Sequence, residues 1–269
     1  MRLSSLSTQT LLTAALVALV VPMAAAQPGR SSDPCAEIRG NNRPTHCEVR
    51  EQTLPFPGVL GVDATPNGGI AVHGWDRGEV HVRARVVATA DTEAEARSLA
   101  GQVQVFTDGG RIGARGPKTS DGASWSVGFD VMVPRQAALE LKTTNGGITI
   151  EDVQGEMTFN TTNGGVTLRR VNGNVRGGTT NGGVRVELDG VGWIGEGLDV
   201  QTRNGGVRLA VPEGYSARLE ASVQNGGLRV DFPVTVQGED SRTISTDLGA
   251  GGPPLKVRTV NGGMTISKK

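Results

Sequence analysis

The fold is decided by a stretch that recurs along the chain and that reads LELKTTNGGITI at residues 139–150. Apolar residues alternate with polar ones on both sides of an Asn-Gly-Gly turn, and a period of two is typical of strands with one buried face. Asn and Gly also tolerate positive φ angles, which β-branched neighbours do not. The stretch therefore predicts two short strands joined by a corner at Asn145.

The Asn-Gly-Gly corner recurs through most of the chain. Its asparagines are Asn67, Asn145, Asn163, Asn181, Asn204, Asn225 and Asn261. From Asn145 onward the spacings are 18, 18, 23, 21 and 36 residues, the last being two periods of 18. Weaker turns follow at Gln154-Gly155, Asn172-Gly173, Asp189-Gly190 and Glu213-Gly214. We expect the asparagines from Asn145 onward to be structural turns whose side chains stack and hydrogen-bond in a column.

Two architectures fit this repeat. Asn-Gly between alternating runs is a strong hairpin signal, and its repetition would give an antiparallel meander. A near-constant period with recurring turn residues is instead the signature of a solenoid, in which like residues stack about 4.8 Å apart. We favour the solenoid: an all-β, single-stranded β-solenoid (β-helix) with coils of 18 to 23 residues.

The segment before the repeats has a different pattern. Alternation predicts strands at residues 79–86 and 125–131. Between them, Thr92 and Glu95 have the spacing of a capping box that opens a short helix through about Leu99. We expect these strands and this helix to cap the open end of the solenoid, which would otherwise expose unpaired strand edges.

The chain begins with the pattern of a secretory signal peptide at residues 1–26. Arg2 precedes an apolar run, and Ala24-Ala25-Ala26 offers a cleavage site. The alternative, a membrane anchor, fits less well because the run is too short to cross about 30 Å comfortably. We expect an exported protein, periplasmic or secreted to the cell surface, with no membrane span after cleavage.

The predicted domains follow from these patterns. Residues 27–54 form an N-terminal arm, and residues 55–269 form the solenoid domain. Within that domain, residues 55–136 hold the cap and first coils, and residues 137–269 hold the Asn-Gly-Gly repeats. Cys35 and Cys47 are the two cysteines, and after export we expect them to form a disulfide. A metal site with His46 is the poorer alternative, because too few ligands lie nearby.

The composition excludes several function classes. Lys plus Arg equals Asp plus Glu at 27 each, so no overall field attracts nucleic acid. The histidines His46, His73 and His81 are too scattered for a metal cluster or a catalytic triad. The candidate carboxylates of a polysaccharide-active enzyme do not recur at one repeat position: Asp152, Glu187, Asp189, Glu213 and Asp231. We therefore expect a non-enzymatic protein without metal or cofactor.

One outward-facing position offers a candidate ligand site. The second residue after the glycine pair is arginine in three successive repeats, namely Arg185, Arg208 and Arg229, with Thr149, Thr167 and Thr265 at the other repeats from Asn145 onward. Stacked guanidinium groups could hold carboxylate or phosphate groups of an anionic envelope polymer. The plainer alternative, which we favour at this stage, is a solvated face balanced by Glu187, Asp199 and Glu220.

The repeats at residues 143–147, 161–165 and 179–183 all read TTNGG, and residues 67–76 read NGGIAVHGWD. Through these motifs, residues 56–269 resemble the bacterial putative adhesin family. The resemblance implies an exported or envelope-associated β-solenoid that acts as an adhesin-like binding or structural module, with an envelope glycan or a surface protein as partner. It also allows an envelope-stress sensing domain that works through a protein partner. A polysaccharide-active β-helix enzyme is the remaining alternative.

Overall fold

The computed structural model describes Cys35 and residues 43–119, 122–232 and 242–269. All described residues belong to one compact unit, residues 34–269. The predicted signal peptide at residues 1–26 lies outside the described residues. Within the described ranges, no helix has the length and hydrophobicity that a membrane crossing needs.

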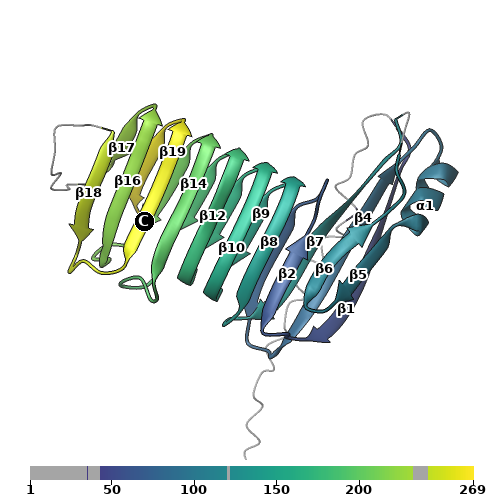
Figure 1. The fold of residues 1–269 in the computed structure, drawn as a ribbon, viewed down its shortest axis with the longest axis horizontal. Helices are drawn as coiled ribbons and strands as arrows, with labels where there is room; N and C mark the ends of the chain where they lie inside the picture. The colour runs from purple at the N-terminus through teal and green to yellow at the C-terminus, as the bar shows by residue number, and fades with distance from the viewer. Residues whose placement is uncertain (1–34, 36–42, 120–121, 233–241) are drawn as a thin grey trace, which may run out of the picture. The chain divides into compact units, whose positions relative to one another are not determined.

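The described strands form two ten-stranded sheets, which we call sheet A and sheet B (Figure 1). In spatial order, sheet A contains β1 (Thr45–Pro55), β4 (Glu79–Thr89), β7 (Ser124–Pro134), β3 (Ile70–Trp75), β9 (Ile148–Glu151), β11 (Val166–Arg169), β13 (Val184–Glu187), β15 (Val207–Val211), β20 (Met264–Lys268) and β17 (Leu228–Val230). Sheet B contains β18 (Thr243–Leu248), β16 (Ala217–Asn225), β19 (Pro254–Asn261), β14 (Gly197–Asn204), β12 (Asn172–Asn181), β10 (Gln154–Asn163), β8 (Ala138–Asn145), β2 (Val59–Asp63), β6 (Arg111–Arg115) and β5 (Gln104–Asp108).

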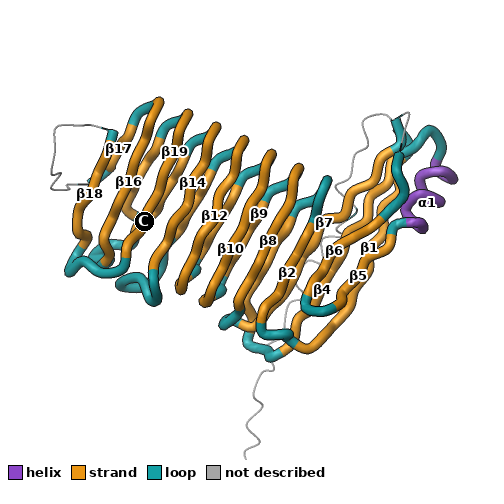
Figure 2. The backbone as a smooth tube through the Cα atoms, in the orientation of Figure 1, coloured by secondary structure: helices purple, strands orange, loops and turns teal. Residues whose placement is uncertain are grey.

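Each repeat forms one coil with a strand in each sheet. β8 turns at Asn145 into β9, and β10 turns at Asn163 into β11, so that strands and corners alternate regularly along the chain (Figure 2). Neighbouring coils pair in parallel and in equivalent register, with Asn163 opposite Asn145 on one side and Asn181 on the other. The all-β prediction is confirmed, and the parallel pairing gives a β-solenoid-like arrangement that excludes the antiparallel meander for these repeats.

The coils do not stack in chain order at the C-terminal end. The last coil, β19 and β20, lies between the coil of β14 and β15 and the coil of β16 and β17. β16 and β17 therefore lie one position beyond the coil that would follow β14 and β15 directly. β18 pairs antiparallel with β16 at the sheet edge, and β19 and β20 occupy the position between the two coils. The expectation that the 36-residue spacing spans two stacked periods is therefore wrong, because β18 lies within it and pairs antiparallel at the sheet edge.

The core lies between the two sheets. Side chains alternate along most of the strands, so that leucine, valine and isoleucine residues of both sheets pack into one buried cluster. Leu139 and Leu141 of β8 are 1% and 3% exposed, whereas Glu140 between them faces solvent. Short aliphatic side chains fill this space because the sheets lie close together across each narrow coil.

Close packing of backbones explains the first glycine of the corners. A Cβ atom on Gly164 would lie 2.1 Å from the carbonyl oxygen of Gly146 in the neighbouring coil, and one on Gly182 would lie 2.1 Å from that of Gly164. Neither glycine has a positive φ angle. We expected glycine at these positions because it tolerates a left-handed backbone, and for these two residues that expectation is wrong. Glycine is required because the neighbouring coil leaves no room for a side chain.

Before the repeats, sheet A continues through longer strands. β4 pairs antiparallel with β1 and β7, and β7 pairs in parallel with β3. The predicted capping box is confirmed: Thr92 and Glu95 cap α1 (Glu93–Gln102), which packs against β1 and β4. Part of the predicted N-terminal arm forms β1, and a disulfide joins Cys47 of this strand to Cys35.

Candidate functional site

The corner asparagines form one continuous column of hydrogen bonds. Each side-chain amide donates through Nδ2 to the Oδ1 of the asparagine before it, over 2.8 to 2.9 Å. The column runs in the spatial order Asn67, Asn145, Asn163, Asn181, Asn204, Asn261 and Asn225. These amides hold neighbouring coils together, and their groups are largely engaged with each other.

A row of buried threonines lies beside this column, and the sequence interpretation did not assign it a role. Each threonine donates from Oγ1 to a glycine carbonyl of the neighbouring coil over 2.7 to 2.8 Å. The row contains Thr143, Thr161, Thr179, Thr202 and Thr259. The signal was present in the sequence, because each threonine stands two residues before a corner asparagine.

The three candidate arginines do not form one uninterrupted ladder. Arg185 and Arg208 are direct neighbours on β13 and β15. Arg208 and Arg229, however, both pair with Thr265 of β20, which separates them. The expected ladder of three is therefore wrong, because the last coil inserts between the coils that carry Arg208 and Arg229.

The arginines also differ in their partners. Arg185 donates from Nε to Glu187 over 2.7 Å, and Arg229 donates from Nε to Asp231 over 2.6 Å. In both cases the carboxylate stands two residues after the arginine. Arg208 has Ala210 at that place, and it makes no hydrogen bond or ion pair with the residues that the structure describes.

Two of the three expected balancing carboxylates lie elsewhere. Glu187 does pair with Arg185. Asp199 and Glu220 are on sheet B, where they pair with Arg258 and Lys256. Of the three carboxylates expected to balance the arginines, only Glu187 does so, by pairing with Arg185. Arg208 is an exposed cation.

Arg185 and Arg208 line a hollow of about 510 Å³ on the outer face of sheet A. Its floor contains the second corner glycine of four adjacent coils: Gly165, Gly183, Gly206 and Gly263. Thr167 and Thr265 flank the two arginines. We call this hollow the arginine groove. Because the glycines have no side chains, there is room for a ligand beside the two guanidinium groups. The threonine hydroxyl groups lie on the two sides of the arginine pair.

The candidate catalytic carboxylates are each paired with a basic side chain. Asp152 pairs with Arg170, Glu187 with Arg185, Asp189 with Lys269, Glu213 with Lys268 and Asp231 with Arg229. The hydrogen bond from Arg170 lowers the pKa of Asp152, and that from Arg185 lowers the pKa of Glu187. A general acid requires a raised pKa, so neither carboxyl is suited to protonate a leaving group.

The three histidines lie at separate places. His46 and His81 contact Glu48 and Glu51 at 3.9 and 3.7 Å, and His73 lies between Asp130 and Glu151 at 3.8 and 3.4 Å. In the part of the chain that the structure describes, no group of three or more potential ligands is arranged to hold a metal ion.

A further hollow, of about 780 Å³, lies over β6, β2, β8, β10 and β12 in sheet B. Its basic side chains are Arg111, Arg115, Lys142 and Arg176, and its acidic ones are Asp63 and Glu140. The guanidinium of Arg115 stacks over the Phe106 ring, 4.8 Å from its centroid. We call it the sheet B hollow. Because its basic side chains outnumber its acidic ones, it is an alternative to the arginine groove as a site for an anionic ligand.

Comparison with known proteins identifies the family of the repeats. The family model described as Toastrack DUF4097 matches residues 130–267. No curated protein matches the chain.

Solved structures with a similar trace share little sequence with this chain. A putative cell adhesion protein from Clostridium sporogenes is 12% identical, with a TM-score of 0.46, over 83% of this chain and 100% of that one. A putative adhesin from Bacteroides fragilis is 10% identical, with a TM-score of 0.36, over 82% and 97%. A putative lipid binding protein from Parabacteroides distasonis is 14% identical, with a TM-score of 0.31, over 86% and 99%.

Proposed function

The chain belongs to the Toastrack DUF4097 family, and from that premise we propose that it is a non-enzymatic, adhesin-like binding module of the cell envelope. Its ligand is an anionic envelope polymer, such as a glycan that carries carboxylate or phosphate groups. The disulfide between Cys35 and Cys47 supports export to an oxidising compartment, periplasmic or extracellular. The coils serve as the scaffold that presents the binding surface.

The observation that carries this proposal is the exposed guanidinium of Arg208, which has no partner among the described residues and lies beside four corner glycines. Arginine binds carboxylate and phosphate through paired donors in a planar fork. Arg185 adds a second guanidinium on the adjacent strand, while Thr167 and Thr265 supply hydroxyl groups. A chain-like ligand laid across the strands would meet these four side chains in succession.

The proposal includes the finer architecture predicted from the sequence. The two sheets are the two faces of one single-stranded β-solenoid with coils of 18 to 23 residues. The strands β1, β4 and β7 and the helix α1 cap its N-terminal end. Their pairing gives partners to strand edges that would otherwise invite association with other chains.

Retention on immobilised polygalacturonate and heparin tests the proposal, with neutral dextran as the control matrix. The double variant Arg185→Ser/Arg208→Ser should lose most retention, and Arg229→Ser, matched in chemistry but outside the groove, should keep it. Ala210→Glu should also weaken retention, because it gives Arg208 the carboxylate that Arg185 and Arg229 already have. Retention should fall as salt rises, as expected for screened charges.

Other outcomes would redirect the assignment. If Lys142→Ser/Arg111→Ser abolishes retention and the groove variant does not, the sheet B hollow is the anion site and the arginine groove is not. If none of the acidic polymers is retained, while a surface protein is captured by the mature chain, the stress-sensing alternative through a protein partner gains support. Hydrolysis of a glycan by the purified protein would contradict a non-enzymatic role.

A further inference from the structure

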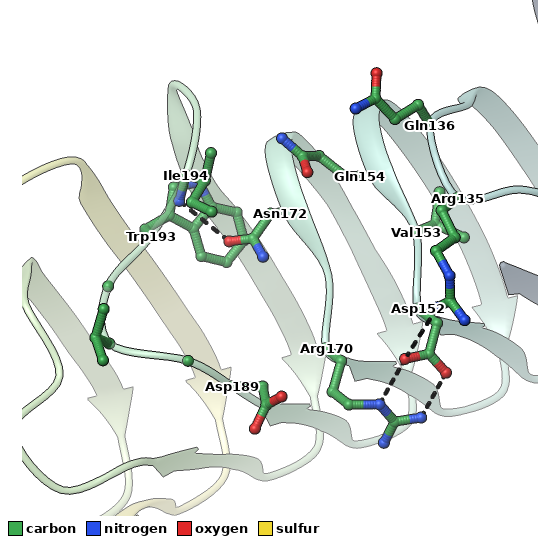
Figure 3. A pocket seen from close by; sticks show the side chains of 13 residues that line it. Arg135, Gln136, Asp152, Val153, Gln154, Arg170, Asn172, Asp189, Trp193 and Ile194 are labelled. Atoms are coloured by element: carbon green, nitrogen blue, oxygen red, sulfur yellow. Dashed lines mark hydrogen bonds and ion pairs between the residues drawn. The ribbon is translucent and has the colours of Figure 1, made fainter. Parts of the chain in front are cut away.

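A separate hollow, of about 720 Å³, lies at the corners where the chain returns from sheet A to sheet B (Figure 3). It is lined by residues after β7, β9, β11 and β13, and we call it the corner groove. Its members are Arg135, Gln136, Asp152, Val153, Gln154, Arg170, Asn172 and the loop of residues 189–194. It does not share a residue with the arginine groove.

One wall of the corner groove is an insertion in the repeat. The spacing from Asn181 to Asn204 is 23 residues, where the preceding spacings are 18, and the additional residues fall in the loop between β13 and β14. Insertions in repeat proteins map to loops that often form the binding face. The loop exposes Val191 and Ile194 at 84% and 59% of their surface.

Specific contacts hold this loop in place. Trp193 is 5% exposed, and its Nε1 donates to the Gly173 carbonyl over 2.9 Å. The backbone N–H of Ile194 donates to Oδ1 of Asn172 over 3.1 Å. The exposed apolar side chains are therefore presented on an ordered support. Among the described residues they are the two most exposed large hydrophobic side chains, and an apolar surface of this kind, rimmed by polar residues, suits a ligand-binding groove.

The charged wall is held in an uncommon backbone conformation. Asp152 and Arg170 have φ angles of 60° and 51°, a region that non-glycine residues seldom adopt and that is often found at functional sites. Arg170 donates from Nε and Nη2 to the two carboxylate oxygens of Asp152, both over 2.6 Å. With Arg135 and Asp189, the wall carries two positive and two negative charges.

The opposite wall is a row of primary amides, as Figure 3 shows. Gln136, Gln154 and Asn172 occupy equivalent positions of successive coils. Among the described residues, the side chains of Gln136 and Gln154 have no hydrogen-bond partner, and Asn172 uses Oδ1 alone. Each amide can donate and accept, so this row offers both kinds of group to a ligand.

The backbone of the groove argues against a peptide that adds a strand. Gln154 donates its N–H to the Arg135 carbonyl over 2.7 Å, and Asn172 donates its N–H to the Val153 carbonyl over 3.2 Å. These coil-to-coil bonds occupy the groups that strand addition would need. Recognition in the corner groove therefore depends on side chains.

We propose that the corner groove binds a neutral oligosaccharide. A sugar chain carries hydroxyl groups that both donate and accept, which suits the amide row and the paired charges of the opposite wall. The apolar faces of its rings fit against Val191 and Ile194. The balanced charge of the lining gives no attraction for a polyanion, so this site is distinct from the arginine groove in ligand as well as place.

Isothermal titration calorimetry of the full chain with maltohexaose, cellohexaose and hexa-N-acetylchitohexaose tests this site. At least one sugar should bind, and Gln136→Ala/Gln154→Ala should weaken it about thirtyfold, as expected for the loss of two hydrogen bonds of about 1 kcal/mol each. Ile194→Ser should weaken it as well. Gln201→Ala, an exposed glutamine of β14 in sheet B, is the matched control and should bind as the unaltered chain does.

The outcomes separate the two sites. Arg185→Ser/Arg208→Ser should retain oligosaccharide binding, so the inference survives even if the anionic polymer proposal fails. Binding of none of the three sugars would overturn it. So would equal binding by the double glutamine variant. Thermal unfolding that matches that of the Gln201→Ala control shows that a weaker binding is not a loss of fold.

Discussion

The coils of β8 to β13 and the coils at the C-terminal end use the same contacts in different order. In the first group, each coil stacks on the one before it in the chain. At the end, β19 and β20 insert between coils that precede them. The asparagine column continues through both groups without a break, since Asn261 bonds to Asn204 and Asn225 bonds to Asn261. The repeat thus specifies how two coils meet, and it does not specify which two.

The largest effect should separate the first glycine of a corner from the second. A Cβ on Gly164, the first glycine of its corner, would meet the Gly146 carbonyl oxygen at 2.1 Å, whereas one on Gly227, the second glycine of the corner at Asn225, would meet nothing within 4 Å. Gly164→Ala should therefore lower the free energy of unfolding by about 3 kcal/mol, and Gly227→Ala by less than about 0.5 kcal/mol. Chemical denaturation measures both, and equal losses would show that the two glycine positions are packed alike.

The threonine row gives the next largest contrast. Thr161 donates to the Gly146 carbonyl, and the same position in the coil of β16 is Val223. Thr161→Val should cost about 1 to 1.5 kcal/mol, because a buried hydrogen bond is lost with little change in shape. Val223→Thr should be neutral or stabilising. A neutral Thr161→Val would contradict the structural role given to this row.

The amide column predicts a smaller difference between its middle and its end. Asn181 donates to Asn163 and accepts from Asn204, while Asn225 makes one bond, to Asn261. Asn181→Ala should cost about 1 kcal/mol and Asn225→Ala about half as much, since these side chains are exposed. The denaturation midpoints of the two variants test whether the hydrogen bonds of the column stabilise the fold. A larger loss of stability for Asn225→Ala than for Asn181→Ala would contradict this role.

The smallest effect concerns the stability of the fold at acidic pH. The hydrogen bond from Arg185 lowers the pKa of Glu187 in the folded chain. A carboxyl with a lowered pKa adds stability above its unfolded pKa, and this stability is lost as pH falls through the folded pKa. Glu187→Gln should therefore show a shallower fall in Tm between about pH 5 and pH 3 than the unaltered chain. An unchanged slope would remove Glu187 from the stabilising pairs.

Local features of the fold could be predicted from the sequence because they depend on neighbouring residues. Alternation and the Asn-Gly-Gly corners locate the strands, and Thr92 with Glu95 locates the start of the helix. The coil order could not be predicted, because equivalent corners at Asn204, Asn225 and Asn261 have the same contacts to offer each other. Nothing in residues 226–260 marks the antiparallel β18 or the return of the chain.

The candidate site was partly visible in the same way. Arg185, Arg208 and Arg229 stand out by position, and the carboxylate two residues after Arg185 and Arg229 could have distinguished Arg208. The interruption by Thr265 depends on the coil order and was hidden for that reason. In the corner groove, the 23-residue spacing marked an insertion, but the placement of Trp193 and Ile194 required the folded loop.

The position of the last coil is the central claim, since it decides which arginines share a groove. Two double variants, Arg208→Cys/Thr265→Cys and Arg208→Cys/Arg229→Cys, test it by oxidation and mass mapping of the cross-link. Adjacent strands lie within reach of a disulfide, whereas strands two positions apart, about 10 Å, do not. The structure predicts a cross-link between positions 208 and 265 and none between positions 208 and 229. The reverse result would mean that the coils stack in chain order and that all three arginines form one ladder.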